Sequence, residues 1–358
     1  MTERRTVLVT GAAGHVGAEV VHRLATRGHD VVALVHDRME IVANNGRRVR
    51  NVPVLRGDVR RASFGLDTLA GLTDRIGLIV HCAAVTDFGL PEHRYTELNV
   101  DATANVLDVA RSWGAGVIYV STAYVCGDAD GIFREDQLDI GQRFGNHYEH
   151  SKFRAENLVR ESDLRWAVVR PGIVAGECRT GHSRVHKHIY QVVKLIAEGK
   201  LRTLPGNYAA TLALSPIGHV ADTLVGVAER FADNVGKTFH AVGANTVSLR
   251  SMSDVLAEYP SLRMADLVPP STFSPDDLGR IERGYFQKVG SLYTSYLQRR
   301  NEFDSANTRN LLGIAPPPIG AGYLRKILDS CLRTGYLGVA EPTVADALTV
   351  LQMMRAAR

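Results

Sequence analysis

Short apolar runs recur through the first half of the chain, and each one ends at a glycine or a polar turn. Uninterrupted apolar runs of about five residues are typical of parallel strands that are buried on both faces. Helical patterns, notably at residues 95–111 and 148–160, separate the runs. This alternation predicts an α/β fold with a doubly wound parallel sheet and right-handed crossovers. The expected strands cover residues 6–10, 31–35, 52–56, 77–81, 117–121 and 166–170.

The first expected strand leads into a glycine-rich turn. Gly11, Gly14 and Gly17 follow Thr10, and the amphipathic segment 18–27 follows the turn. Strand, glycine turn, helix and second strand therefore fall within about 30 residues, as in a dinucleotide-binding unit. Glycines let the backbone approach a pyrophosphate at the N-terminus of the helix. The sequence thus predicts a nucleotide site at this turn.

The composition is that of a soluble globular protein, with 45% hydrophobic and 22% charged residues in 358. The net charge is +4 and both signs are mixed along the chain, so we expect no nucleic-acid partner. The longest apolar runs are far shorter than a membrane span, and the N-terminus carries no apolar signal region. The four cysteines are scattered without a Cys-x-x-Cys pair, which favours a reducing, cytoplasmic setting.

Two tyrosines stand four residues before a lysine, at Tyr148 and Lys152 and again at Tyr190 and Lys194. On a helix this spacing puts both side chains on one face. An ammonium beside a phenol favours the phenolate and lowers the pKa of the tyrosine from about 10. Such a tyrosine can give or take a proton near neutral pH, as hydride transfer to or from a carbonyl requires. The spacing alone does not choose between the two pairs.

The order of motifs resembles the extended branch of the short-chain dehydrogenase/reductase superfamily. The first turn, TGAAGHVG, has the spacing Gly-x-x-Gly-x-x-Gly of that branch. The later motifs, within residues 5–240, are Ala83-Ala84, Asn99-Val100-Asp101-Ala102-Thr103, Ser121-Thr122 with Gly127, Tyr148 with Lys152, and Pro171-Gly172-Ile173. The resemblance implies a Rossmann-type sheet and a nicotinamide cofactor. It favours the Tyr148 pair, because Tyr190 and Lys194 lie beyond the sixth strand and are expected to form an exposed helix pair.

The resemblance also implies a role for each catalytic residue. Tyr148 is the general acid or base, and Thr122 hydrogen-bonds the carbonyl oxygen, with Ser121 as the alternative hydroxyl. Lys152 lowers the pKa of the tyrosine and holds the ribose hydroxyls. Asn99 supports Lys152 through water, or is a structural residue that bends its helix.

The same resemblance implies the cofactor contacts. They are Thr10, Gly11, Gly14, His15, Val16 and Gly17 at the turn, Asp58 and Val59 beside the adenine, Ala83 and Ala84, Tyr148 and Lys152 themselves, and Pro171, Gly172 and Ile173 over the nicotinamide. The second strand ends at Val35 instead of an acid, and His36 and Arg38 follow. This favours NADP(H) over NAD(H), because cations suit a 2′-phosphate and an acid suits a free ribose. Asp37 would bind an NAD ribose if the register shifted by one residue.

Three segments resemble the fatty acyl-CoA and carrier-thioester reductases of the male sterility type. They are residues 81–88 (HCAAVTDF), 121–125 (STAYV) and 170–176, the last followed by Thr180-Gly181. The implied reaction is reduction of an aldehyde, a ketone or a CoA- or carrier-linked acyl thioester. Gly218 departs from the pattern of that subgroup, which has an acid there. A sugar-nucleotide epimerase or dehydratase, a hydroxysteroid-type dehydrogenase and a non-catalytic cofactor-binding protein remain the alternatives.

The chain is expected to divide into two parts. Residues 1–175 form the cofactor-binding domain, and a strand and a helix return to it at about 212–243. Residues 176–358 form a smaller, mostly helical substrate-binding region. Within it, residues 284–300 are predicted to be a helix whose tyrosines fill the core or wall a substrate tunnel. Residues 344–357 are predicted to be a helix that acts as a lid or a homodimer contact.

Histidines and cations are dense between Arg179 and Lys194. One interpretation is a solvated basic helix, and the other is a basic lip that holds a diphosphate or phosphopantetheine group. His182 and His186 stand four residues apart on this expected helix. A zinc site would need a third ligand, and no motif supplies one, so no metal is expected.

Overall fold

The computed structural model describes residues 6–66 and 75–338. Within them, seven parallel strands form a sheet with the order β12-β7-β5-β4-β1-β2-β3. The strands are β1 (Thr6–Thr10), β2 (Val31–Val35), β3 (Val54–Arg56), β4 (Ile76–His81), β5 (Gly116–Val120), β7 (Trp166–Pro171) and β12 (Lys237–Ala241). The order runs outward in both directions from β1 and β4, which confirms the doubly wound, Rossmann-like α/β fold.

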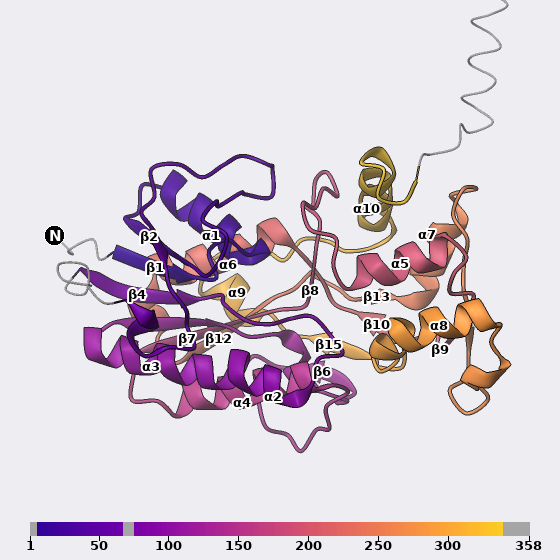
Figure 1. Cartoon of the computed structure of the whole chain (residues 1–358), viewed down its shortest axis with the longest axis horizontal. Coiled ribbons are helices and arrows are strands. Elements are labelled where there is room, and N and C mark those ends of the chain that lie inside the picture. Colours follow the sequence, from indigo (N-terminus) through magenta and orange to yellow (C-terminus); the bar gives the residue numbers. More distant parts are fainter. Residues whose placement is uncertain (1–5, 67–74, 339–358) are drawn as a thin grey trace, which may run out of the picture.

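Helices cover both faces of this sheet (Figure 1). On one face lie α1 (His15–Thr26) and α6 (Ile217–Glu229), and on the other lie α3 (Ala102–Trp113) and α4 (His147–Glu161). Each interface is apolar because the buried strands carry side chains on both faces. Val9 packs with Leu24 on the first face, and Ile79 packs with Val106 on the second; all four side chains are fully buried.

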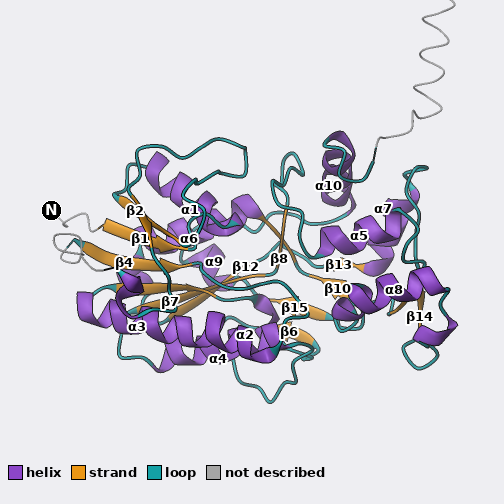
Figure 2. Ribbon diagram, viewed as in Figure 1, coloured by secondary structure: helices purple, strands orange, loops and turns teal. Residues whose placement is uncertain are grey.

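Two short helices lie beside the sheet layers: α2 (Glu92–Tyr95) packs against α4, and α9 (Ala306–Asn310) packs against β12. Most of the remaining elements lie beyond the carboxyl ends of the strands (Figure 2). Tyr190, Leu212, Val255, Phe286 and Leu324 belong to the hydrophobic core of that part. The remaining elements are β6 (Gly131–Phe133), β8 (Ile173–Ala175), α5 (Ile189–Ala197), β9 (Thr203–Pro205), β10 (Thr211–Leu212), β11 (Leu214–Pro216), β13 (Val247–Ser248), α7 (Leu249–Ala257), β14 (Asp266–Val268), α8 (Arg280–Lys288), β15 (Asn301–Phe303) and α10 (Ala321–Arg333).

The helical pattern predicted over 95–111 is confirmed, with a π-helical segment, Thr96–Asp101, before α3 begins. A second predicted helix is wrong in its extent. The helix expected over 284–300 ends with α8 at Lys288, and a 3-10 turn follows. Gly290 lies so close to the Phe286 ring that a Cβ there would be 2.8 Å from it.

Two further expectations concern helices predicted around residues 182–186 and over 344–357. The segment 179–188 is a loop, and α5 begins only at Ile189, so His182 and His186 do not share a helix. The helix expected over 344–357 lies outside the described residues. No helix in the described part of the chain combines the length and apolarity needed to cross a bilayer.

Candidate active site

A cleft of about 430 Å³ opens at the carboxyl edge of the sheet. Doubly wound folds bind their ligands where the strand order reverses, here between β1 and β4. The cleft gathers the turn after β1, the end of β5, the start of α4 and the loop before α5. The predicted site residues that line it are Gly11, Gly14, His15, Val16, Gly17, Arg38, Ala84, Thr122, Tyr148, Lys152, Pro171, Gly172 and Ile173.

Tyr148 lies in the first turn of α4, and its position follows from the helix cap. The side-chain oxygen of Asn146 accepts a hydrogen bond from the Glu149 N–H at 2.9 Å, which fixes where the helix begins. Tyr148 therefore lines the cleft, one helical turn before Lys152. Burial raises the pKa of Tyr148, and a hydrogen bond with Thr122 partly opposes this rise. The tyrosine thus holds its proton firmly.

Lys152 is 2% exposed and lies beneath the cleft. Its Nζ donates a hydrogen bond to the Val120 carbonyl at 2.7 Å and lies 4.2 Å from the centre of the Tyr119 ring. Burial lowers the pKa of Lys152 to about 7, although the nearby Glu156 carboxylate raises it. Burial has the largest effect on the pKa of both groups, and a lowering of the Tyr148 pKa by Lys152 stays a prediction.

Two neighbouring hydroxyls, those of Ser121 and Thr122, follow β5, and both residues line the cleft. Thr122 contacts Tyr148, and its Oγ1 donates to the Pro171 carbonyl at 3.3 Å. The Ser121 hydroxyl is buried near Glu156 and helps to lower the pKa of that carboxyl. The contact with Tyr148 favours Thr122 over Ser121, and its role as the catalytic hydroxyl stays a prediction.

Asn99 sits in the π-helical segment and is 1% exposed. Its Oδ1 accepts from the Val85 N–H at 2.8 Å, and its Nδ2 donates to the Val85 carbonyl at 3.1 Å and to Ser151 Oγ at 2.9 Å. These bonds join the loop after β4 to the helix that carries Tyr148. They match the structural alternative for this residue, and a water-mediated link to Lys152 stays a prediction.

Aromatic side chains form the wall opposite the glycine turn. The Phe88 ring lies 5.7 Å from Tyr148, 5.1 Å from Tyr293 and 5.8 Å from Tyr296, measured between ring centres. Tyr124 packs edge-on against Tyr296 at 4.8 Å. The tyrosines predicted within residues 284–300 thus contribute to both the core and the cleft. Phe88 stands four residues after Ala84 in the HCAAVTDF segment, and this motif was its only sequence signal.

Behind the aromatic wall, a buried ion pair supports the start of α4. Arg299 donates to both carboxylate oxygens of Glu149, at 2.9 and 3.1 Å, and their side chains are 7% and 0% exposed. The Gly145 N–H donates to the same carboxylate at 3.0 Å. Glu149 follows Tyr148 directly, so a residue 150 positions away in the chain holds the catalytic helix in place. Sequence reasoning missed this pair because no local pattern joins the two residues.

Residues 9–224 match the model of a family described as male sterility protein, an NAD-binding family. The match covers well over half of the chain. The chain belongs to this family. It is an NAD(P)-dependent oxidoreductase of the extended short-chain dehydrogenase/reductase superfamily, which confirms the resemblance drawn from its motifs.

Relatives of this oxidoreductase include larger proteins. The L-2-aminoadipate reductase large subunit of Penicillium chrysogenum is 25% identical over 311 residues, which cover 76% of this chain and 22% of that protein. The chain therefore spans about a fifth of the length of that relative. The dTDP-4-dehydro-6-deoxy-D-allose reductase of a Streptomyces species is 32% identical over 48% of this chain and 56% of its own length. The terminal R domain of the myxalamid PKS-NRPS pathway has the same fold, with a TM-score of 0.81, 24% identity and coverage of 95% and 94% of the two chains.

The glycine turn of this oxidoreductase fits the pyrophosphate of a nicotinamide nucleotide. Gly11 has φ +64°, and a Cβ there would lie 2.7 Å from the Ala83 backbone. A Cβ at Gly17 would collide with the Gly11 carbonyl oxygen. Both ring nitrogens of His15, at the first position of α1, are buried without a protein partner among the described residues. Burial lowers the pKa of His15 to about 4, so the ring is a neutral donor that faces the cleft.

Behind the turn, three predicted residues make hydrogen bonds within the protein. Thr10 Oγ1 and His81 Nδ1 lie 2.8 Å apart, and the Ala83 N–H donates to Thr10 Oγ1 at 3.3 Å. The Val59 carbonyl accepts a hydrogen bond from Asn105 Nδ2 at 3.3 Å. These contacts support the cleft, and direct cofactor contacts of Thr10, Val59 and Ala83 stay predictions.

Charged residues cluster at the expected ribose end of the site. His36 lies 3.0 Å from the Asp37 carboxylate and 3.6 Å from that of Asp58. Hydrogen bonds from Arg60 hold the pKa of Asp58 at about 2, so its carboxylate is already engaged. Arg38 is exposed and lines the cleft. Whether Asp58 flanks an adenine stays a prediction.

The segment 179–188, which is rich in histidines and cations, lies along the cleft as a loop. Arg184, Lys187 and His188 line the cleft, and Lys187 pairs with Asp87 across its mouth at 2.7 Å. Burial lowers the pKa of Arg184, and the charge of nearby Arg38 lowers it further. The Nε atom of Arg184 is buried without a partner among the described residues. In the described ranges, no group of three or more His, Cys, Asp or Glu side chains is placed to hold a metal ion.

The second tyrosine pair has a different environment from the one expected. Tyr190 is 4% exposed, and its hydroxyl accepts a hydrogen bond from the Gly176 N–H at 2.8 Å. The expectation of an exposed helix pair is therefore wrong for Tyr190. Lys194 instead lies over the Tyr336 ring, 4.6 Å from its centre. Tyr190 is a core residue of the second hydrophobic cluster.

Proposed function

We propose that this protein is an NADPH-dependent reductase that converts an acyl thioester, linked to CoA or to a carrier, into an aldehyde. The observation that carries the proposal is the pairing of the Thr122 and Tyr148 hydroxyls above the buried Lys152, in a cleft that continues to the glycine turn. The similarity to an L-2-aminoadipate reductase and to the fold of a terminal R domain supports the substrate class.

Each residue has a defined task in this reaction. A bound NADPH supplies the hydride to the carbonyl carbon of the thioester. Thr122 and Tyr148 hydrogen-bond the carbonyl oxygen, and Tyr148 passes its proton to that oxygen as negative charge develops there. The C–S bond then breaks, and the thiol leaves with that proton while the C=O bond of the aldehyde forms. One thioester, one NADPH and one proton thus give one aldehyde, one thiol and NADP⁺.

The cations beside the turn support the preference for NADPH. Arg38 and Arg184 lie near one another on the cleft wall, and the Nε of Arg184 has no protein partner among the described residues. A 2′-phosphate would accept hydrogen bonds from both guanidinium groups. The Asp37 carboxylate, which could bind a free ribose, is paired with His36 instead.

The first test is oxidation of NADPH in the presence of acyl-CoA and acyl-pantetheine thioesters. Tyr148→Phe should lower kcat by about 10²- to 10⁴-fold, the usual contribution of a general acid, while cofactor affinity persists. Tyr190→Phe is the matched control and should keep kcat within about twofold, because Tyr190 lies outside the described cleft lining. Near-full activity of Tyr148→Phe would overturn the assignment.

The second test separates the cofactors and the substrates. Arg38→Ala should raise the KM for NADPH by about tenfold or more, the value of a lost charge-assisted hydrogen bond, and leave the KM for NADH unchanged. A dTDP-4-keto sugar serves as the competing substrate, because one relative is a reductase of that class. Reduction of the sugar but of no thioester would reject the thioester proposal, and no oxidation with any substrate would reject a reductase.

A further inference from the structure

The loop after β2 folds back on itself as a short hairpin, with Asn44 at its tip. Val42 and Arg48 form an antiparallel bridge, and the turn between them contains Asn45-Gly46, a sequence that favours tight turns. Asn44 is nevertheless only 6% exposed. Its burial therefore comes from contacts with other parts of the chain.

These contacts fasten Asn44 to the loop 179–188. Its Nδ2 donates to the His182 carbonyl at 3.0 Å, and its Oδ1 accepts from the Arg184 N–H at 2.9 Å, although the two partners lie 138 and 140 positions away. The Asn44 carbonyl oxygen lies 3.0 Å from His182 Nε2. The Asn44 N–H donates to the buried carboxylate of Glu19, on α1, at 2.9 Å. Every polar atom of Asn44 thus has a partner, and the residue joins two loops to the helix that follows the glycine turn.

Arg184 is the residue through which this junction reaches the cleft. Arg184 lines the cleft together with Arg38, which belongs to the same loop as Asn44, whereas Asn44 is not part of the cleft lining. Burial lowers the pKa of Arg184, and the charge of Arg38 lowers it further. The Nε atom of Arg184 is buried without a partner among the described residues. Two neighbouring cations, one with an N–H that lacks an acceptor, form a site suited to an anion.

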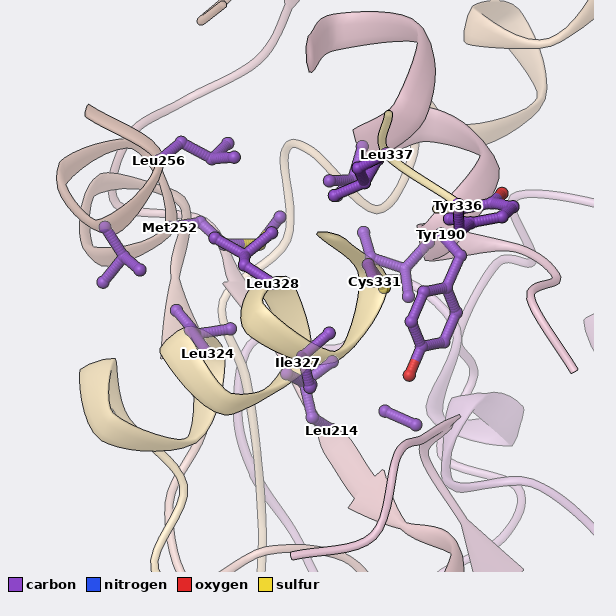
Figure 3. A pocket seen from close by; sticks show the side chains of 14 residues that line it. Tyr190, Leu214, Met252, Leu256, Leu324, Ile327, Leu328, Cys331, Tyr336 and Leu337 are labelled. Atoms are coloured by element: carbon purple, nitrogen blue, oxygen red, sulfur yellow. The ribbon is translucent and has the colours of Figure 1, made fainter. Parts of the chain in front are cut away.

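The far end of the loop 179–188 has contacts of its own. His186 stacks on the Tyr336 ring at 4.2 Å between centres. Tyr336 in turn lies 6.4 Å from the Tyr190 ring, in the apolar group that Figure 3 shows. Because these contacts do not involve Asn44, its loss should release the first part of the loop and leave the His186 end in place.

We infer that Asn44 is a positioning residue that holds Arg184 beside Arg38, so that the two guanidinium groups form one site for the 2′-phosphate of NADPH. This inference rests on the proposed preference for NADPH and adds to it a specificity-determining residue that acts through Arg184. Ordering a long side chain and its loop during binding would cancel much of the gain from a charge-assisted hydrogen bond. Asn44 lowers this cost because it fixes the Arg184 backbone before the cofactor binds.

The test measures the 2′-phosphate contact without turnover, by calorimetric binding of adenosine 2′,5′-bisphosphate and of adenosine 5′-monophosphate. The unaltered chain should bind the bisphosphate more tightly by about tenfold or more. Asn44→Ala should lower this ratio by about fivefold or more and leave the affinity for the monophosphate within about twofold. In kinetics, the KM for NADPH should rise by the same factor, whereas the KM for NADH and kcat at saturating NADPH should stay within about twofold.

A double-mutant cycle separates positioning from general damage to the fold. In an Arg184→Ala background, the further change Asn44→Ala should leave the ratio unchanged, because no guanidinium is left to position. Additive losses in the two single variants would overturn the inference. Asn44→Asp keeps the acceptor for the Arg184 N–H and loses the donor to His182, so it should give an intermediate ratio; it takes the place of Asn44→Ala in the cycle if that variant does not fold.

Asn245 offers a matched control outside the cleft lining. Its Nδ2 donates to the Ile319 carbonyl, and its Oδ1 accepts from the Ile319 N–H at 3.2 Å, 74 positions away. Asn245→Ala therefore removes a similar pair of long-range bonds and should lower stability without changing the ratio. An equal fall of the ratio in Asn245→Ala would show an effect of stability alone and would overturn the inference.

Failure of the positioning role differs from failure of the proposed function. If Arg38→Ala lowers the ratio but a folded Asn44→Ala does not, the positioning role is wrong and the preference for NADPH stands. If the unaltered chain binds both nucleotides equally well, the preference for NADPH is wrong, and the positioning role with it. If the ratio falls as expected but no substrate is reduced, the positioning role stands and the reductase is wrong.

Discussion

The buried ion pair between Arg299 and Glu149 joins the part of the chain beyond the sheet to α4, the helix that carries Tyr148. Both guanidinium–carboxylate bonds are short, 2.9 and 3.1 Å, and the Glu149 side chain is fully buried. Arg299→Met keeps most of the apolar stem and removes the charge. Because the carboxylate would remain buried without its cation, we expect the free energy of unfolding to fall by about 3–5 kcal/mol.

The structure supplies a matched control for this change. Arg325 and Glu258 form a similar two-bond pair, at 2.6 and 2.7 Å, but their side chains are 46% and 43% exposed. Arg325→Met should cost about 0–1 kcal/mol, because solvent screens an exposed pair. The contrast between the two variants isolates the effect of burial from the effect of losing an arginine.

Urea denaturation measures both variants and a double variant, Glu149→Gln with Arg299→Met. The double variant should recover much of the loss, because no buried charge is left and the glutamine oxygen can still accept from the Gly145 N–H. The single variant should also lose up to about 100-fold in kcat, since a shift at Glu149 moves Tyr148. A cost below about 1 kcal/mol for Arg299→Met, or a double variant as unstable as the single one, would refute the reasoning.

Three further outcomes follow from the site. Burial lowers the pKa of Lys152 from its ordinary 10.5 to about 7, so the unfolded chain binds more protons than the folded one between these pH values. The free energy of unfolding should therefore rise with pH across this window. Lys152→Met should lose that rise in urea titrations at about pH 7 and 10. Gly17→Ala should weaken cofactor binding by about tenfold or more in fluorescence titrations while the fold persists, because its Cβ would displace the Gly11 carbonyl. Thr122→Ala should lower kcat by at least about tenfold, whereas Ser121→Ala should lower it less, because Thr122 is the hydroxyl that contacts Tyr148; parallel kinetics and melting curves would check both.

The sheet could be predicted from sequence because its information is local. Five-residue apolar runs and a glycine turn are complete signals within about 30 residues, and the strand order follows from the general rules of doubly wound folds. Thr122 and Tyr148 were predicted from the order of motifs shared with the short-chain dehydrogenases/reductases, since the tyrosine–lysine spacing alone fits two pairs. Their meeting in one cleft needed only that β5 and α4 be correctly assigned.

The other half of the cleft could not be predicted, because its contacts join distant residues. The segment 179–188 has helical spacing but is held as a loop by Asn44, which donates to the His182 carbonyl at 3.0 Å and accepts from the Arg184 N–H at 2.9 Å. Such side-chain bonds compete with the helical backbone pattern. Tyr190 likewise has the spacing of an active pair, and its burial with a hydrogen bond from the Gly176 N–H could not be predicted from that spacing.

The division between the two halves of the cleft has a consequence for specificity. In the proposed reaction, residues from the sheet and from α4 would face the carbonyl, whereas α5, Tyr293 and Tyr296 line another part of the cleft. These two sets are not independent, because Tyr296 packs against Phe88, which touches Tyr148, and Arg299 holds Glu149. A substitution in α5 that changes the substrate should therefore leave kcat intact, whereas one at residues 293–299 should alter kcat and KM together. Residues 293–299 contact the groups that position Tyr148, so a substitution there that alters substrate binding also alters the proposed proton donor.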